Sequence, residues 1–301
     1  MSHNHNHNHQ ISGNSLLFSI FLNILITAAQ IVGGLISGSL ALLSDAIHNL
    51  SDVISLIISY LANLLSNRKK QTLEQTFGYK RAEIIAAFIN SGTLIIIAIF
   101  LAIEAIKNLF ETHEIKSDIV IWLALLGILA NGLSVVLIKK DASHNLNMKS
   151  AYLHLLTDML TSVAVFVGGL LMKFYQIYWI DAVLTLVISI YLMIISWKIL
   201  VDSLQILMLF APKGLVIKDI EKEIINLKEV KNIHHVHVWQ LNEYDCHFEA
   251  HIEFKKDVNL SEFDKVCEEI EKILKEKFNI NHSNLQPEFF RNDEKKFIIQ
   301  D

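Results

Sequence analysis

The sequence predicts an α-helical membrane protein with six transmembrane helices, followed by a C-terminal α+β domain. Three observations support this fold class. Over half of the 301 residues are apolar, mean hydropathy is positive, and there are only two prolines. Before Leu204 the apolar residues form blocks of about 20 or more, the length that crosses ~30 Å of hydrocarbon. After Leu204 these blocks give way to mixed-charge and alternating patterns, which are typical of a water-soluble domain.

The N-terminal tract, residues 1–13, reads MSHNHNHNHQISG and carries His3, His5, His7 and His9. It is polar and has no apolar period, so we expect it to be disordered. Two interpretations stay open: loose capture of a transition metal near a transport entrance, or a purification tag or neutral tail. The tract leads directly into a long apolar segment, so no cleavable signal peptide is predicted.

Six apolar segments are predicted to span the bilayer within a transmembrane domain of residues 14–203: 15–36, 39–65, 82–108, 118–139, 149–172 and 177–200. Basic residues concentrate in the connections after the second and fourth segments: Arg68, Lys69, Lys70, Lys80, Arg81, Lys139, Lys140 and Lys149. The alternate connections hold only Lys107, Lys116 and Lys173. Because cytoplasmic loops are the ones enriched in Lys and Arg, we expect both termini in the cytoplasm.

The C-terminal domain is predicted over residues 204–291. Its expected elements are a helix at 217–228, strands at 233–241 and 246–254, a helix at 261–278 and a strand at 283–290. The second strand alternates between apolar and polar residues, which indicates one buried face. The order α-β-β-α-β suggests a ferredoxin-like domain. Residues 292–301 are expected to be a frayed polar tail.

Charge and cysteine content exclude several functions for this domain. From Leu204 onward there are 14 Lys+Arg against 19 Asp+Glu, which accounts for the whole net charge of −5. A mildly acidic domain gives no support for nucleic-acid binding. Cys246 and Cys267 form no C-x-x-C pair, and in a cytoplasmic domain we expect them to be reduced packing residues. The chain has no Walker-type phosphate loop, so no nucleotide is expected.

A nine-residue pattern, S-x-x-x-H-x-L-[S/T]-D, occurs twice inside predicted spans, with an offset of 106 residues between the copies. Each His lies four residues before an Asp, so His48 and Asp52 share one helix face, as do His154 and Asp158. The two spans run in opposite directions, and at 1.5 Å per residue the pairs overlap in depth near the bilayer midplane. Two imidazole nitrogens and two carboxylate oxygens would form a tetrahedral set suited to zinc.

A bound cation explains these carboxylates better than local pairing does. Each Asp inside a span costs on the order of 3 kcal/mol, and no Lys or Arg is predicted at that depth. His–Asp pairing within one helix would not explain why the pattern recurs in a second helix. Asp45, one turn before His48, is not assigned as a ligand. We expect Asp181 to be a solvated helix-start charge, and the intramembrane amides to be interhelical contacts: Asn23, Gln30, Asn90 and Asn131.

The ligand types predict proton-coupled exchange. Histidine binds metal only when neutral, and its unperturbed pKa is ~6.5, so protons compete with zinc at His48 and His154. A site that alternates between the two membrane faces would exchange zinc for protons. A metalloenzyme would need a general base and an open coordination position, and neither copy of the pattern supplies them. The remaining alternatives are a metal sensor that moves no ion, and transport of cadmium, cobalt, iron or nickel.

The chain resembles zinc transporters of the cation diffusion facilitator family, in its bacterial CzcD/ZitB-like branch. The segments that carry the resemblance are 42–52, 76–83, 146–158, 211–214 and 237–239. The resemblance implies a homodimer in a bacterial inner membrane, with six helices and a cytoplasmic ferredoxin-like domain. It also implies a secondary transporter rather than an enzyme, exporting zinc in exchange for protons. By position, the implied transport ligands are His48, Asp52, His154 and Asp158.

The same resemblance implies a second, regulatory metal site in the C-terminal domain. Its candidate ligands are His234, His251 and Glu288, with His282 nearby. Gln286 stands where some relatives place a histidine, so no complete binuclear centre is assigned. The alternative interpretation is that these are solvated strand residues without a metal.

Overall fold

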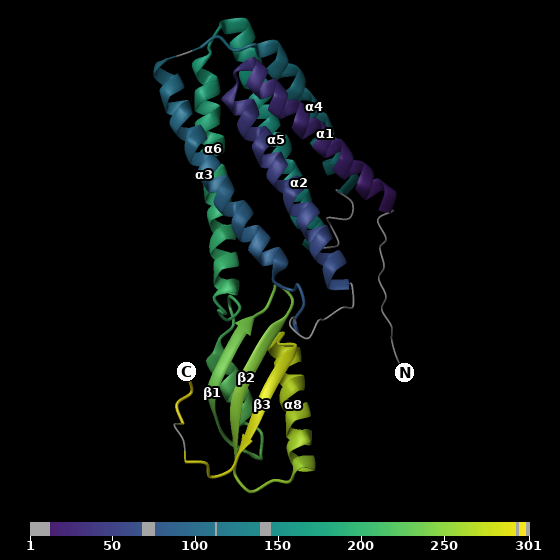
Figure 1. Cartoon of the computed structure of the whole chain (residues 1–301), viewed down its shortest axis with the longest axis vertical. Helices are drawn as coiled ribbons and strands as arrows, with labels where there is room; N and C mark the ends of the chain where they lie inside the picture. Colours follow the sequence, from purple (N-terminus) through teal and green to yellow (C-terminus); the bar gives the residue numbers. More distant parts are fainter. Residues whose placement is uncertain (1–12, 68–75, 112, 139–145, 293–294, 299–301) are drawn as a thin grey trace. The chain divides into compact units, whose positions relative to one another are not determined.

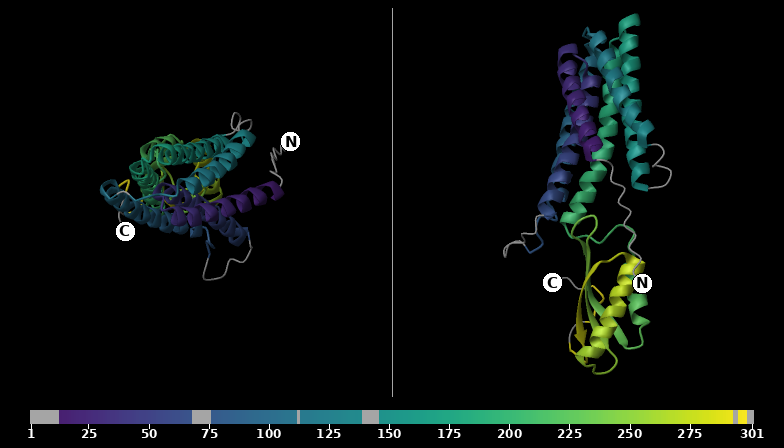
Figure 2. Two further views of the ribbon diagram at one scale, coloured as in Figure 1. Left: turned by 90° about the horizontal axis from the view of Figure 1, so that it is seen from above. Right: turned by 90° about the vertical axis from the view of Figure 1, so that its right-hand side faces the viewer.

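The computed structural model describes residues 13–67, 76–111, 113–138, 146–292 and 295–298. The predicted histidine tract lies outside the described residues, apart from Gly13, and so do five of the basic loop residues: Arg68, Lys69, Lys70, Lys139 and Lys140. The chain divides into two compact units, Met1–Leu61 with Ile89–Ile199 and Ala62–Phe88 with Leu200–Asp301. Figure 1 and Figure 2 show that the first unit is built from long helices, while the second contains the sheet.

Helices occupy all six predicted spans: α1 (Gly13–Ser37), α2 (Leu40–Asn67), α3 (Ala82–Phe110), α4 (Ser117–Ile138), α5 (Leu146–Tyr175) and α6 (Trp179–Leu207). Within the described residues, four are long and apolar enough to cross a membrane: α3, α4 from Ser117 to Val136, α5 from Tyr152, and α6. The segment Ile24–Ser37 of α1 is apolar but shorter. Helix α6 continues beyond the predicted end at residue 200, because a helix does not stop where hydropathy falls. It ends at Leu207, before Leu209 at φ 63° and Pro212.

Small residues let the helices approach closely. A Cβ atom added to Gly33 would lie 1.9 Å from Cδ1 of Leu123, and one added to Gly169 would lie 2.9 Å from Cγ1 of Ile121. These contacts join α1 to α4 and α5 to α4, where a larger side chain would push the helices apart. Figure 1 shows α1, α4 and α5 together in the helical unit.

Asp181 of α6 caps the start of α2. Its Oδ1 accepts a hydrogen bond from the Ser39 hydroxyl at 2.5 Å, and its Oδ2 accepts from the backbone N–H groups of Leu40 at 2.8 Å and Ala41 at 3.4 Å. The residue is 2% exposed, so the prediction of a solvated charge is wrong. The first N–H groups of a helix have no partner within that helix, and here a carboxylate from another helix supplies the acceptor.

The second unit contains the predicted α-β-β-α-β order: α7 (Ile217–Ile225), β1 (Val230–Gln240), β2 (Cys246–Phe254), α8 (Leu260–Phe278) and β3 (His282–Glu288). The sheet order is β1-β2-β3, with β1 antiparallel and β3 parallel to β2. The apolar face predicted for β2 is buried, and it packs in one core with Ile220 of α7 and Ile270 of α8. Cys246 and Cys267 are free thiols, and burial raises the pKa of each to about 11, which fits unreactive packing residues.

The predicted frayed tail is wrong for the residues described near its end. The backbone N–H of His235 donates to the carbonyl of Lys296 at 3.1 Å, and that of Val236 donates to the carbonyl of Phe297 at 2.8 Å. Phe297 also packs against the domain core. Strand β1 lies at the edge of the sheet, so its outward N–H groups can donate hydrogen bonds to a segment that offers carbonyls. We call residues 295–297 the strap.

Candidate metal centre

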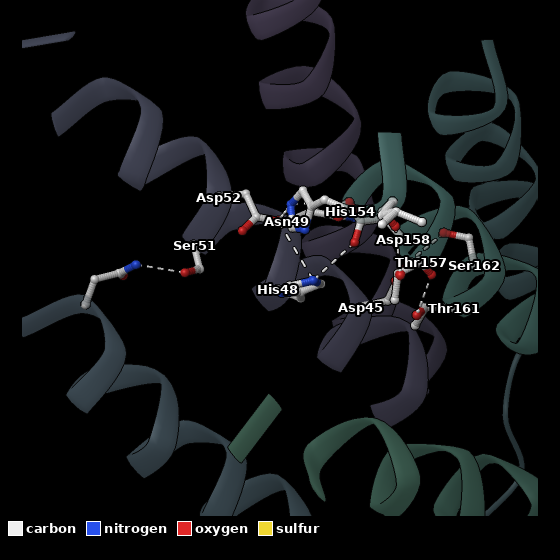
Figure 3. A network of polar contacts seen from close by, with 12 residues as sticks. Asp45, His48, Asn49, Ser51, Asp52, His154, Thr157, Asp158, Thr161 and Ser162 are labelled. Atoms are coloured by element: carbon white, nitrogen blue, oxygen red, sulfur yellow. Dashed lines mark hydrogen bonds and ion pairs between the residues drawn. The ribbon is translucent and has the colours of Figure 1, made fainter. Parts of the chain in front are cut away.

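The four residues of the repeated pattern come from two helices and converge on one point (Figure 3). Helix α2 carries His48 and Asp52, and α5 carries His154 and Asp158. The i, i+4 spacing places each pair on one helix face, one turn apart. The structure therefore brings together all four residues that the sequence predicted for the transport site. Their role as metal ligands stays a prediction.

Each histidine lies closer to the aspartate of the other helix than to its own. The Nε2 atom of His48 is 3.2 Å from Oδ1 of Asp158 and 3.9 Å from Oδ2 of Asp52. The Nε2 atom of His154 is 3.3 Å from Oδ2 of Asp52 and 3.6 Å from Oδ2 of Asp158. The dominant contacts thus cross between the two copies of the pattern, whereas pairing within each helix is the longer contact in both cases.

These separations match a tetrahedral metal site. Zinc binds imidazole nitrogen and carboxylate oxygen at about 2.0–2.2 Å, so two such ligands in a tetrahedron lie about 3.3–3.5 Å apart. The four His–Asp separations run from 3.2 to 3.9 Å. One ion placed among these four side chains would neutralise the two carboxylates. Among the described ion pairs, neither carboxylate contacts a Lys or Arg.

The cluster is buried on one side and open on the other. The side chains of His48 and Asp158 are 8% and 6% exposed, whereas those of Asp52 and His154 are 27% and 48% exposed. Asp52 and His154 therefore form the more exposed side of the cluster, and His48 and Asp158 form its buried side.

A polar network surrounds the buried half of the cluster. Asp45 is fully buried, and its Oδ2 accepts hydrogen bonds from Gln30 of α1 at 3.2 Å and Ser162 of α5 at 3.1 Å. Asn49 donates to the side-chain oxygen of Gln30 at 3.2 Å. Asp45 thus links three helices beside the cluster. The prediction that Gln30 forms interhelical contacts is confirmed, and Asn90 behaves likewise, donating to Ser51 at 2.8 Å.

Sequence reasoning missed one residue beside the cluster. The ring of Tyr191, on α6, lies edge-on to His48 with 6.4 Å between ring centroids. A single tyrosine in an apolar span carries no pattern that would have identified it. Its ring packs against the His48 imidazole from a third helix.

A second cluster lies in the α+β domain, among three of the predicted regulatory residues. Oε2 of Glu288 is 3.1 Å from Nε2 of His234, and Oε1 is 2.8 Å from Nδ1 of His251. The Glu288 and His234 side chains are 1% and 0% exposed. Burial, aided by nearby positive charge and opposed by Glu288, lowers the pKa of His251, so its ring is neutral and able to bind metal at neutral pH.

His282 does not belong to this cluster. In the parallel register of β2 and β3, His282 pairs with His247, whereas Glu288 pairs with Glu253 six residues further along. Six strand residues span about 20 Å, so the prediction that His282 lies near the site is wrong. Its ring instead packs on His247, with 4.4 Å between centroids. Six residues are close along the sequence, but an extended strand holds them far apart.

The segment before α3 contacts the loop between β1 and β2. Nζ of Lys80 lies 2.7 Å from Oδ2 of Asp245, and the Phe77 ring packs edge-on against His247 at 5.7 Å. Burial alone would raise the pKa of Asp245, but Lys80 and the hydrogen bonds from Asn242 and Asn281 together lower it. Burial and the neighbouring His282 lower the pKa of His247, which therefore packs as a neutral ring at pH 7.

Two family models and several curated proteins are similar to this chain. The family model described as "Cation efflux transmembrane domain" matches residues 16–208, and that described as "Cation efflux protein, cytoplasmic domain" matches residues 212–290. The chain is 33% identical over 261 residues to the "Cadmium, cobalt and zinc/H(+)-K(+) antiporter" of Bacillus subtilis, covering 86% of this chain and 83% of that protein. It is 33% identical over 296 residues to the "Zinc transporter ZitB" of Pectobacterium atrosepticum, covering 98% and 91%. It is 32% identical over 258 residues to the "Metal cation efflux system protein CzcD" of Cupriavidus metallidurans, covering 86% and 81%.

Proposed function

The chain belongs to the cation efflux family, and on this premise we propose that it is a secondary transporter that exports zinc from the cytoplasm in exchange for protons. The predicted resemblance to the CzcD/ZitB-like branch is confirmed by the two family models and by relatives that carry those names. Similar proteins are named as transporters and antiporters, not as enzymes.

The observation that carries the proposal is the crossed arrangement of the transmembrane cluster. His48 and Asp158 approach from opposite helices, as do His154 and Asp52. A site divided between two helices can bind and release an ion when those helices move relative to each other, which a site on one helix cannot do. A site of two neutral nitrogens and two carboxylates favours zinc over magnesium or calcium, since magnesium and calcium bind at all-oxygen sites.

Protons supply the driving force in this account. An imidazole that binds a proton cannot bind zinc through the same nitrogen. When the cluster faces a compartment rich in protons, His48 and His154 take up protons and zinc leaves. When it faces a compartment poor in protons, the imidazoles lose those protons and bind zinc again. The residues of this chain therefore exchange one cargo for the other at the same atoms.

Further parts of the proposal concern location, assembly and regulation. We place the protein in the inner membrane of a bacterium. Because Lys and Arg concentrate in alternate loops, we place both termini on the cytoplasmic side. We propose a homodimer on the basis of the match to the cytoplasmic domain of cation efflux proteins. The cluster of His234, His251 and Glu288 is proposed as a regulatory zinc site, because its ligand atoms lie within 4.8 Å of one another in a mostly buried position.

The rival within this class is export of a different divalent ion. The relative from Bacillus subtilis is named for cadmium and cobalt as well as zinc. Imidazole nitrogen is a ligand that suits several transition metals, so the donor set alone does not separate zinc from cobalt.

Metal uptake into sealed proteoliposomes with an imposed pH gradient tests the proposal. We expect zinc movement with the wild-type chain, and none with Asp158→Ala. The matched control is Asp118→Ala, since Asp118 is 71% exposed and pairs only with Lys173 among the described ion pairs. Parallel runs with cadmium and cobalt identify the preferred ion. Equal zinc uptake by wild type and Asp158→Ala, with both proteins folded, would refute the transport site.

A further inference from the structure

A lysine ammonium already lies within the cytoplasmic cluster. Nζ of Lys295 is 2.7 Å from Oε2 of Glu288 and 3.4 Å from Nε2 of His234. The two atoms that it contacts are 3.1 Å apart. The positive charge of the strap therefore contacts a carboxylate oxygen and an imidazole nitrogen that the proposed regulatory site would use to bind zinc.

This position coincides with the one that a metal ion would need. An ammonium group has three donors and no acceptor, so it bonds to His234 in the tautomer whose Nε2 carries no proton and accepts through its lone pair. A metal ion binds through that same lone pair. Tetrahedral ligands at about 2.0–2.2 Å from zinc lie about 3.3–3.5 Å apart, close to the separation of the two atoms. A divalent ion and the ammonium cannot occupy the space between them together.

The backbone of the strap keeps the ammonium in place. The carbonyls of Lys296 and Phe297 accept hydrogen bonds from His235 and Val236 of β1, and Phe297 packs on the domain core. Lys295 is thus attached directly beside the cluster, with its side chain 28% exposed. A tethered group competes at a high effective concentration without any additional ligand.

Arg291 contacts the same carboxylate but plays a different part. Its Nη1 lies 3.4 Å from Oε1 of Glu288, the oxygen that faces His251, and its side chain is 56% exposed. Arg291 thus contacts the other carboxylate oxygen of Glu288, whereas Lys295 contacts Oε2 together with Nε2 of His234. We therefore test the direct overlap with a metal ion at Lys295.

We propose that Lys295 is a built-in competitor for the cytoplasmic cluster, so that a divalent transition-metal ion binds there only by displacing the lysine ammonium. This inference rests on the proposed role of the cluster as a regulatory zinc site. The competition raises the zinc concentration at which the cluster binds metal. At low zinc the Lys295 ammonium occupies the cluster, and metal replaces it when zinc accumulates. The apparent dissociation constant is weakened by the fraction of molecules in which the strap is undocked.

Zinc binding to the full-length protein in detergent tests this competition, in an Asp158→Ala background that removes a transmembrane ligand. Binding that disappears on a further Glu288→Gln change is assigned to the cluster. We expect Lys295→Met, which keeps the length of the side chain but removes its charge, to tighten the assigned binding about tenfold, as for a strap docked about nine-tenths of the time. Lys295→Arg retains the charge and should bind weakly, like the parent. Lys296→Met is the matched control and should leave the affinity unchanged.

Two results would overturn the inference. Equal or weaker zinc binding by Lys295→Met would show that the ammonium does not compete with metal. Absence of any component sensitive to Glu288→Gln, in every variant, would show that the cluster is not a metal site. Neither result tests the proposed export function, which the vesicle assay of Asp158 variants measures separately.

Discussion

Nε2 of His48 lies 3.2 Å from Oδ1 of Asp158, although 110 residues separate them in the chain. The reciprocal contact, from His154 to Asp52, is 3.3 Å. The two copies of one sequence pattern thus complete each other rather than pairing internally. This relationship makes the cluster sensitive to the relative position of α2 and α5, and it is the basis of the transport account.

Removing the charge from either carboxylate of the cluster is expected to abolish zinc transport. Asp52→Asn and Asp158→Asn each leave a side chain of the same shape that no longer offers a charged oxygen ligand to zinc. The measurement is zinc efflux from cells or vesicles, with protein amount checked in the membrane. Asp118→Asn, on the exposed surface of α4, should transport like the wild type. Normal transport by either cluster variant would contradict the four-ligand site.

Zinc affinity at the transmembrane cluster should weaken as pH falls. Two imidazoles must be neutral to bind, so below a pKa of ~6.5 the logarithm of the dissociation constant should rise by up to about two per pH unit. Zinc titrations of a Glu288→Gln protein between about pH 5.5 and 8 measure this slope. His154→Asp keeps four ligands but only one imidazole, and its slope should fall to about one. An unchanged slope would mean that His154 is not a ligand.

Loss of the cap on α2 should destabilise the helical unit. Asp181→Ala leaves the hydroxyl of Ser39 and the N–H groups of Leu40 and Ala41 without this buried acceptor. The expected cost is about 1–3 kcal/mol in the free energy of unfolding. Thermal unfolding in detergent should show a lower melting temperature than for wild type, whereas Asp118→Ala should melt normally. Identical melting of both variants would argue against the cap.

The Lys80–Asp245 ion pair should contribute to stability at neutral pH and not in acid. Because Lys80 lowers the pKa of Asp245 in the folded protein, the contribution is complete above the unfolded pKa of ~3.9 and is lost as pH falls through the folded value. Lys80→Met should therefore lower the melting temperature slightly at pH 7, since a partly exposed pair contributes about 0–1 kcal/mol. The difference from wild type should vanish in acid. If the difference in melting temperature were independent of pH, its cause would be lost packing of the Lys80 side chain instead.

The helices, and the grouping of the four candidate ligands on two helix faces, could be predicted because both depend on local patterns. Apolar length identified the six helical segments, and the i, i+4 spacing placed His48 with Asp52 and His154 with Asp158 on common faces. The sequence could not show that the shorter contacts cross between the helices, since that depends on how α2 and α5 rotate and tilt. The convergence of the four side chains is a property of the packed structure.

All of the misses except His282 share one physical cause, which is contact between distant segments. Asp181 was predicted to be solvated, but the N-terminus of α2 covers it. His282 seemed close to Glu288 along the chain, but strand geometry separates them. The strap seemed too polar to be ordered, yet edge strand β1 offers it unpaired N–H groups. Tyr191 has no partner nearby in sequence that would have drawn attention to it.

Zinc X-ray absorption of the purified protein shows which side chains bind the ion between α2 and α5. The sample is a Glu288→Gln, His234→Asn protein loaded with one zinc per chain at the transmembrane cluster. We expect four light-atom ligands at about 2.0–2.1 Å, two of them imidazoles, and a loss of one imidazole in His154→Asp. A spectrum with fewer than two imidazoles, or one that His154→Asp leaves unchanged, would contradict the claim that α2 and α5 jointly hold the ion.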